Sequence, residues 1–166
     1  MSDHAQLIER FYTAFGAGDA AGMAACYHPE VTFHDPAFGE LKGWRAAAMW
    51  HMLTSRSADL RLEHSAVQAD GDAGSAHWEA WYTFSATGRS VHNVIDAAFT
   101  FQDGRIHTHT DTFSFWRWSR QALGMPGIFL GWSSFLHNKV QRTATGGLEQ
   151  WITKHEAGEA LIPSLD

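Results

Sequence analysis

Residues 89–113 read RSVHNVIDAAFTFQDGRIHTHTDTF, two strand-like runs separated by Asp103-Gly104. Apolar and polar side chains alternate along both runs, as they do in strands that bury one face. An Asp-Gly pair between two such runs is a strong signal for a tight hairpin. The stretch therefore predicts two antiparallel strands joined by a short turn.

Similar runs extend back to residue 59, with further turn signals at Asp70-Gly71-Asp72 and Thr87-Gly88. Residues 59–114 thus predict a four-stranded antiparallel meander. Upstream, the spacing of apolar residues predicts helices at 4–17, 19–27 and 42–55, with Pro29 ending the second helix. A short alternating strand, VTFHDP, lies at 31–36. Helices followed by a run of strands indicate the α+β class.

The region after residue 115 differs from the meander. WRWSRQALG predicts a short helix, GMP a break and GIFLGWSSFLHNKVQ a second helix, and GLEQWITKHEAG adds a final turn or two. One face of the second helix carries Ile128, Trp132, Phe135 and Leu136. Such a stripe more often packs in a core, a dimer interface or a lid than on a membrane, so we do not expect membrane contact. We expect a domain at 1–115 and a helical extension at 116–166 that packs on it.

Composition limits the classes of function. The chain has 166 residues, the usual size of one domain, and its 8 Trp and 11 Phe suit a core or a large apolar cavity. Lys and Arg number 12 against 18 Asp and Glu, a net charge of −6, which argues against nucleic acid as a partner. The single cysteine, Cys26, indicates a reducing compartment. The sequence shows neither a signal peptide nor a membrane span, so we expect a cytoplasmic protein.

Three aspartates lie among apolar neighbours in strand-like runs: Asp35, Asp96 and Asp111. Burial disfavours the ionised carboxylate, so the pKa of such a group rises toward neutrality. Two such groups close together can divide into one acid and one base. The alternative is that each carboxylate caps a turn or keeps a strand edge soluble.

The run IHTHTDTF raises the question of a metal site. Side chains two residues apart on a strand point the same way, but His107 and Asp111 would lie about 13 Å apart at Cα, too far to share one ion. His109 and Asp111, about 6.6 Å apart, can instead form a hydrogen-bonded couple. A metal would need a third ligand such as His77, Glu79 or His92. No standard ligand spacing is present, so we expect no metal.

The order of these motifs resembles the nuclear transport factor 2-like superfamily, which includes ketosteroid isomerase, the SnoaL-type polyketide cyclases and limonene-epoxide hydrolase. The shared pattern is a helix, Ala-Gly-Asp, a short helix, a His-x-Asp-Pro strand, a third helix and a curved sheet, over roughly residues 4–115. The resemblance implies a cone: a strongly curved antiparallel sheet wrapped on three N-terminal helices, a cystatin-like roll. It also implies a deep apolar pocket that needs no cofactor, and a homodimer formed through the outer sheet face.

The resemblance also implies site residues. Asp35 in FHDP matches the general base of ketosteroid isomerase, and Asp96 in VIDAAFTF matches its protonated oxyanion-hole aspartate. The position of the isomerase's oxyanion tyrosine is occupied by Phe11, next to Tyr12. Asp111 in HTDTF falls on an acid–base aspartate of the SnoaL-type proteins and the epoxide hydrolase. The Arg-x-Asp pair that the hydrolase also uses is absent, since no Arg or Lys lies between Arg61 and Arg89.

Two hypotheses follow. The first is a small-molecule enzyme of isomerase, cyclase or hydrolase type that acts on an apolar carbonyl, polyketide or terpenoid-like substrate, with Asp35, Asp96, Asp111 and His109 as catalytic residues. The second is a non-catalytic dimeric domain of the same fold that only holds a small ligand. The expected substrate-binding residues are Tyr12, Phe15, Phe33, Trp50, His77, Glu79, Trp81 and Phe113.

Overall fold

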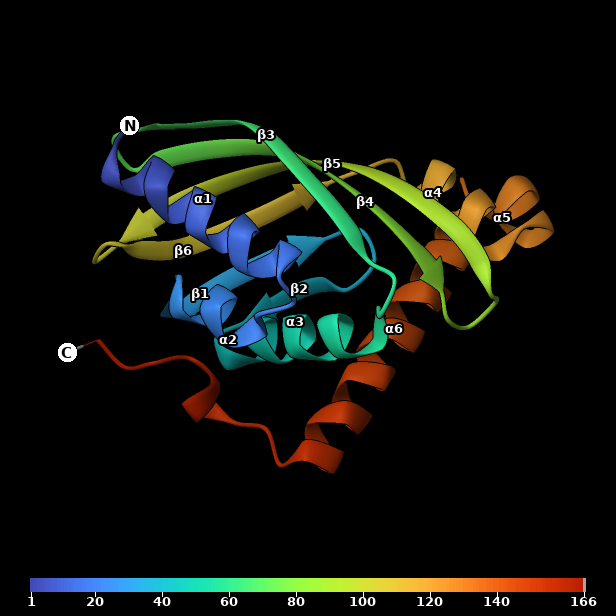
Figure 1. Cartoon of the computed structure of the whole chain (residues 1–166). Coiled ribbons are helices and arrows are strands. Elements are labelled where there is room, and N and C mark those ends of the chain that lie inside the picture. The colour runs from blue at the N-terminus through green and yellow to red at the C-terminus, as the bar shows by residue number, and fades with distance from the viewer. Residues whose placement is uncertain (166) are drawn as a thin grey trace.

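A computed structural model, which describes residues 1–165, confirms the α+β class and the curved sheet (Figure 1). The six strands lie in one unclosed sheet in the order β2-β1-β6-β5-β4-β3. Their bounds are β1 Tyr27–Asp35, β2 Gly39–Lys42, β3 Arg61–Asp70, β4 Ala73–Phe84, β5 Arg89–Gln102 and β6 Arg105–Thr112. The helices are α1 Asp3–Gly16, α2 Ala20–Ala25, α3 Trp44–Arg56, α4 Phe115–Leu123, α5 Met125–Leu130 and α6 Ser134–His155, followed by the 3-10 turn η1 Glu159–Leu161.

The predicted meander, β3 to β6, is confirmed. β4 and β5 pair over their entire facing length, and the β5–β6 turn uses Asp103 and Gly104 at φ 52° and 71°. Positive φ at both positions matches the twist of the flanking strands, which is why Asp-Gly suits this turn. β3 shifts register against β4 between Ser65 and Gln68, where Ala66 has φ 52°. A bulge of this kind bends the sheet.

The pairing of β1 was not predicted. β1 runs parallel to β6, with Phe33 beside His109, and it is flanked on its other edge by the unpredicted strand β2. Pro29 does not end a helix, because α2 already stops at Ala25 and Pro29 lies inside β1. It sits within the register shift between Tyr27 and Thr32, a place where a missing N–H is tolerated.

Two of the N-terminal helices, α1 and α3, carry much of the core under the sheet (Figure 1). α1 begins where the Ser2 hydroxyl accepts a hydrogen bond from the N–H of Ala5, and α2 begins where Asp19 accepts one from Gly22. Capping groups of this kind satisfy N–H groups that the first helical turn leaves unpaired. The buried face of α1 comprises Ala5, Leu7, Ile8, Phe11, Tyr12 and Phe15.

The C-terminal region differs from the expectation in its helix boundaries. Gly124, at φ 71°, separates α4 from α5, and the Ser133 hydroxyl caps a new 22-residue helix, α6. The single helix expected at 127–141 is therefore split, and α6 continues without a break through Gly146 and Gly147. α6 packs beside α3, and His137 Nε2 donates to the Pro36 carbonyl at 2.5 Å, at the turn that follows β1.

No helix among residues 1–165 is long and apolar enough to cross a membrane.

Candidate functional site

A cavity of about 640 Å³ opens between the inner face of the sheet, α3 and the C-terminal helices. This volume lies in the range of small-molecule sites. The sheet and its turns contribute Asp35, Trp78, Ala80, Tyr82, Asn93, Ile95, Asp111 and Phe113, among others. The C-terminal helices contribute Trp118, Leu123, Pro126, Leu136, Lys139, Val140 and further small residues.

Asp35 and Asp111 reach this cavity from neighbouring strands. The parallel pairing of β1 and β6 places His34 beside Thr110, and Asp35 and Asp111 directly follow these two residues. Both aspartates lie two residues beyond the inward-facing pair Phe33 and His109, so their side chains point to the same face. The parallel pairing thus brings two carboxyl groups that are distant in sequence into one apolar pocket.

Asp35 is held by the turn that follows its strand. Its Oδ1 accepts hydrogen bonds from the N–H groups of Ala37 at 2.9 Å and Phe38 at 2.6 Å. Burial raises the pKa of Asp35 to about 7, and the negative charge of Asp111 adds to this against the two backbone hydrogen bonds, which lower it. A carboxyl group with such a pKa can accept and return a proton near neutral pH.

Asp111 is 3% exposed and is fixed by two side chains. His109 Nε2 donates to its Oδ1 at 2.9 Å, and Trp78 Nε1 donates to the same oxygen at 3.3 Å. The His109–Asp111 couple expected from the sequence is therefore present. Its geometry leaves the second oxygen of Asp111 for the cavity.

His109 continues into a buried chain of hydrogen bonds. Its Nδ1 lies 2.8 Å from the Tyr27 hydroxyl, which also accepts a hydrogen bond from Trp50 Nε1 at 2.8 Å. Because an indole N–H can only donate, the single proton of Tyr27 is free to go to Nδ1. The ring proton of a neutral His109 then sits on Nε2 and points at Asp111. This assignment gives every polar group in the chain a partner.

Tyr82 adds a phenol to the cavity wall. Its oxygen accepts a hydrogen bond from Trp118 Nε1 at 2.9 Å, and no acceptor for its own proton occurs among residues 1–165. Burial raises the pKa of Tyr82, the Trp118 hydrogen bond lowers it, and the charge of Asp35 raises it again. Tyr82 is therefore a neutral hydrogen-bond donor, and it lies close enough to Asp35 for the charge of that carboxylate to affect its pKa.

The expected substrate-binding residues divide into three groups. Phe15, Trp50 and Phe113 line the cavity. Tyr12 and Phe33 do not, because both are almost fully buried in the core behind it. The Tyr12 hydroxyl is buried without a hydrogen-bond partner among residues 1–165.

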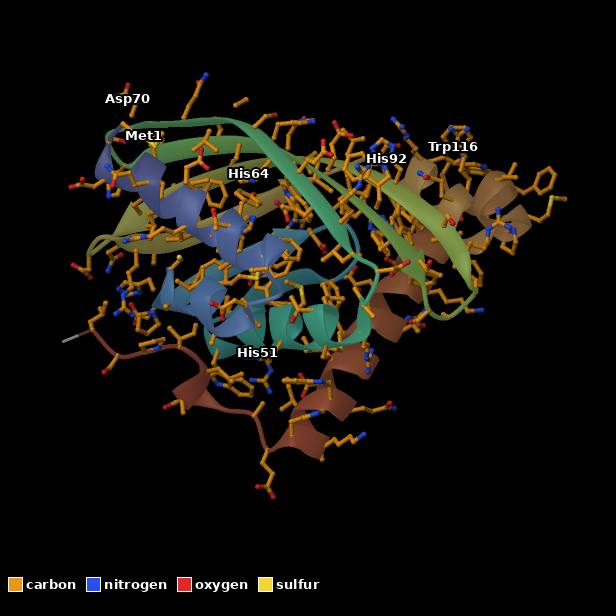
Figure 2. The ribbon with its side chains drawn as sticks, viewed as in Figure 1. Met1, His51, His64, Asp70, His92 and Trp116 are labelled. Carbon is orange, nitrogen blue, oxygen red and sulfur yellow. The ribbon has the colours of Figure 1, made fainter. Side chains whose placement is uncertain are left out.

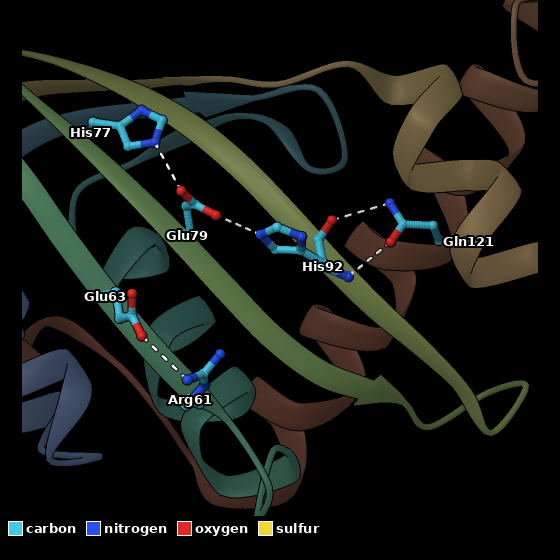
Figure 3. Close-up of polar contacts among 6 residues, drawn as sticks. All are labelled: Arg61, Glu63, His77, Glu79, His92 and Gln121. Atoms are coloured by element: carbon cyan, nitrogen blue, oxygen red, sulfur yellow. Dashed lines mark hydrogen bonds and ion pairs between the residues drawn. The ribbon is translucent and has the colours of Figure 1, made fainter.

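The third group comprises His77, Glu79 and Trp81. It lies on the outer face of the sheet, whereas the sequence interpretation placed these residues in the substrate pocket. Asp96, expected in the pocket as an oxyanion donor, lies on this face as well: its side chain is 81% exposed and accepts a hydrogen bond from His77 Nδ1 at 2.8 Å. Figure 3 shows Glu79 between His77 and His92, on this same face. Trp81 also lies there, since its ring stacks on His92.

The outer-face position also separates the histidines that the metal alternative would combine. His77 and His92 lie on the opposite side of the sheet from His109, so they cannot share an ion with it. Within residues 1–165 no group of three or more His, Cys, Asp or Glu side chains has the geometry to hold a metal ion.

Four polar groups of the site were not singled out from the sequence. Strand alternation could have indicated Trp78 and Tyr82, because both lie on the same face of β4 as the buried Ala76 and Ala80. Tyr27 and Trp118 had no such signal. Tyr27 precedes the register shift of β1, and Trp118 comes from a helix whose docking no local pattern fixes.

The greater part of the chain matches a known protein family. The model of the SnoaL-like domain matches residues 8–109. The chain belongs to the SnoaL-like domain family. A comparison with curated proteins finds no significant match.

Solved structures of this superfamily share the fold. A nuclear transport factor 2-like protein of Burkholderia pseudomallei is 22% identical with a TM-score of 0.64, covering 74% of this chain and 99% of its own. A protein of Xanthomonas campestris provisionally named a polyketide cyclase is 20% identical with a TM-score of 0.61, covering 72% and 96%. An epoxide hydrolase-like protein of Mycobacterium tuberculosis is 18% identical with a TM-score of 0.60, covering 77% and 96%.

The elevated pKa of Asp35 has a direct consequence for stability. Its value of about 7 exceeds the ordinary 3.8, so the folded state holds the proton more tightly than the unfolded chain does. The resulting stabilisation is complete below pH 4 and is lost as pH rises through 7. Asp35→Asn keeps an oxygen for the two backbone N–H groups but cannot ionise. We expect it to raise the free energy of unfolding by about 2–4 kcal/mol at pH 8.

Urea unfolding of both proteins at pH 4 and pH 8 measures this difference. The gain should vanish at pH 4, where wild-type Asp35 is protonated in the folded state. Equal stability of wild type and variant at pH 8 would show that burial does not raise the pKa of Asp35.

Proposed function

We propose that this SnoaL-like protein catalyses proton transfer at a carbon next to a carbonyl group in an apolar substrate, as an isomerase or cyclase does. One observation carries the proposal: two carboxyl groups from adjacent strands, Asp35 and Asp111, line one apolar cavity. The raised pKa of Asp35, about 7, supports its use as a base near neutral pH. The relatives with cyclase and epoxide hydrolase names add support at the level of fold alone.

In the proposed reaction, the Asp35 carboxylate removes a proton from the carbon next to the carbonyl. The electron pair of the broken C–H bond moves to the carbonyl oxygen, and the Tyr82 phenol stabilises that oxygen by donating a hydrogen bond. Protonated Asp35 then returns the proton to a different carbon, or to the alkoxide formed when a ring closes. Asp111, oriented by His109, is the second acid–base group. Tyr82 takes the oxyanion role that the family resemblance implied for Asp96.

Deuterium exchange tests this proposal without knowledge of the natural substrate. Cyclic β,γ-unsaturated ketones and β-keto esters are incubated with the protein in D₂O, and exchange at the carbon next to the carbonyl is followed by NMR. We expect exchange above the buffer rate for compounds that fill the cavity. Compounds that bind tightly with no exchange above buffer would favour the second candidate function.

That second candidate is a non-catalytic domain that binds a small apolar ligand. The size of the cavity, about 640 Å³ with mostly apolar walls, favours it because a large apolar pocket is sufficient for binding. The homodimer through the outer sheet face also stays a proposal. Analytical ultracentrifugation measures it directly.

Tyr82→Phe distinguishes the catalytic function from the binding-only function by removing a single oxygen atom. The variant loses only the phenolic donor, and exchange should fall by roughly 100-fold, the usual effect of removing one oxyanion donor. Ligand affinity should change far less, because the ring remains in the wall. A rate equal to that of wild type would remove Tyr82 from the proposed mechanism.

A further inference from the structure

The exposed apolar side chains of this protein are concentrated in one segment. Of the nine large apolar residues that are exposed within residues 1–165, seven lie between Trp116 and Phe135, and the other two are Met1 and Leu165. Phe129 is 62% exposed and Trp132 is 77% exposed. Figure 1 places α4 and α5 at the end of the molecule opposite the N-terminus, and Figure 2 shows Trp116 there. We call this segment, residues 116–135, the apolar tip.

α5 has its small residues inside and its large ones outside. A Cβ added at Gly127 would lie 2.0 Å from the Ser119 carbonyl oxygen, so α5 is pressed directly against α4 at this point. Gly131 is packed as closely, against Ser119 and the Trp116 ring. The bulky residues of α5 consequently face solvent, the reverse of an ordinary amphipathic helix on a core.

The two tryptophans of the tip are held in place rather than free. Trp116 Nε1 donates to the Ile128 carbonyl at 3.3 Å, and Trp132 Nε1 donates to the Phe129 carbonyl at 2.8 Å. Exposed aromatic rings whose N–H groups are satisfied by backbone are suited to the boundary between water and an apolar phase.

The charge of this part of the chain also differs from the rest. Residues 112–148 contain no Asp or Glu but include Arg117, Arg120, Lys139 and Arg142. The other residues carry 8 Lys and Arg against 18 Asp and Glu, a net charge of −10. The Arg120 guanidinium lies over the Trp116 ring, 4.6 Å from its centroid, so positive charge borders the tip directly.

We propose that the apolar tip docks on the surface of an anionic phospholipid bilayer. Exposed Trp and Phe side chains enter the boundary between head groups and acyl chains, while the flanking arginines meet anionic phosphates. A two-fold dimer through the same surface would bring like charges together, which disfavours a second copy as the occupant. The sequence alone argued against membrane contact. The exposure of Ile128, Trp132 and Phe135 changes that interpretation.

The same elements form part of the cavity wall, so docking would bring the cavity next to the bilayer. Leu123, Pro126 and Leu136 line the cavity, and they lie within or directly beside the apolar tip. An apolar molecule dissolved in the bilayer would meet this wall without crossing water. Docking requires no turnover, so it stands or fails independently of the chemistry proposed above.

Vesicle flotation tests the proposal with the full-length protein. Vesicles of phosphatidylcholine and phosphatidylglycerol at 7:3 should carry the wild-type protein, and pure phosphatidylcholine should carry about tenfold less. Phe129→Ser/Trp132→Ser should weaken binding to the anionic vesicles by roughly 100-fold. Both side chains are exposed, so the variant should fold, and circular dichroism and thermal unfolding verify this.

A charge series provides the matched control. Arg117→Glu/Arg142→Glu should weaken binding to anionic vesicles by about tenfold or more. Arg10→Glu/Lys154→Glu makes the same change in net charge on exposed positions outside the tip and should bind nearly as wild type does.

Three results would overturn the proposal: no binding of wild type to anionic vesicles, equal binding by Phe129→Ser/Trp132→Ser, or equal loss in the two charge variants. A wild-type oligomer that this double serine variant converts to monomer, without vesicle binding, would identify a second copy as the occupant instead.

Discussion

Asp35→Asn and Asp111→Asn are each expected to lower the rate of deuterium exchange by 1,000-fold or more. Asparagine keeps the shape of the carboxyl group and the hydrogen bonds that its oxygen accepts, but it cannot take a proton at neutral pH. The proton transfer then falls to water, which is neither positioned nor sufficiently basic. The measurement is the NMR exchange rate at saturating substrate, together with the dissociation constant from titration.

Asp96→Asn is the matched control for this pair. It makes the same chemical change on an exposed carboxyl group of the outer sheet face. We expect it to retain the wild-type exchange rate. If Asp96→Asn abolished exchange while Asp35→Asn and Asp111→Asn did not, the assignment of the inner cavity as the site would be wrong.

His109→Ala is expected to lower the free energy of unfolding by about 3–5 kcal/mol. The imidazole is fully buried among aromatic rings, including those of Phe33 and Phe99. Its loss leaves a cavity and deprives both the Tyr27 hydroxyl and Asp111 of a hydrogen-bond partner. Urea unfolding monitored by tryptophan fluorescence measures the change.

Two companion variants make this result specific. His107→Ala deletes the same ring two residues earlier on β6, at a half-buried position, and should cost about 1 kcal/mol or less. His109→Gln retains an N–H for Asp111 and should recover part of the loss. Equal destabilisation by His107→Ala and His109→Ala would mean that the buried hydrogen-bond chain contributes nothing of its own.

The meander and one half of the site were predictable because strand alternation is a local property. His109 and Asp111 are two residues apart on one strand, so their common direction follows from the pleat. Asp35 is likewise indicated by its apolar neighbours on a short strand, and the resemblance of its Asp-Pro turn to a known family implies its role as a base. Its contact with the cavity depends on the parallel pairing of β1 and β6, which no local pattern encodes.

The interpretation of Asp96 failed for an instructive reason. Alternation with the buried Ile95 and Phe99 places Asp96 on the opposite face, whereas the Ile-Asp resemblance to a known oxyanion group implies a place in the pocket. Alternation does not distinguish the two faces of β4, because Trp81 is aromatic on the outside as Trp78 is on the inside. Which face of β4 lines the cavity depends on how the helices dock on the sheet, which is a tertiary property.

The parallel pairing of β1 with β6 bears on how the protein folds. Asp35 and Asp111 are 76 positions apart, so their strands can meet only after a large loop has closed. Contacts of such long sequence separation slow folding, and they form late in synthesis because β6 leaves the ribosome after everything it must join. Until then β1 offers an unpaired edge to other chains. The two carboxyl groups thus come together only when the nascent sheet is complete, which makes cavity binding a sensitive readout of full folding.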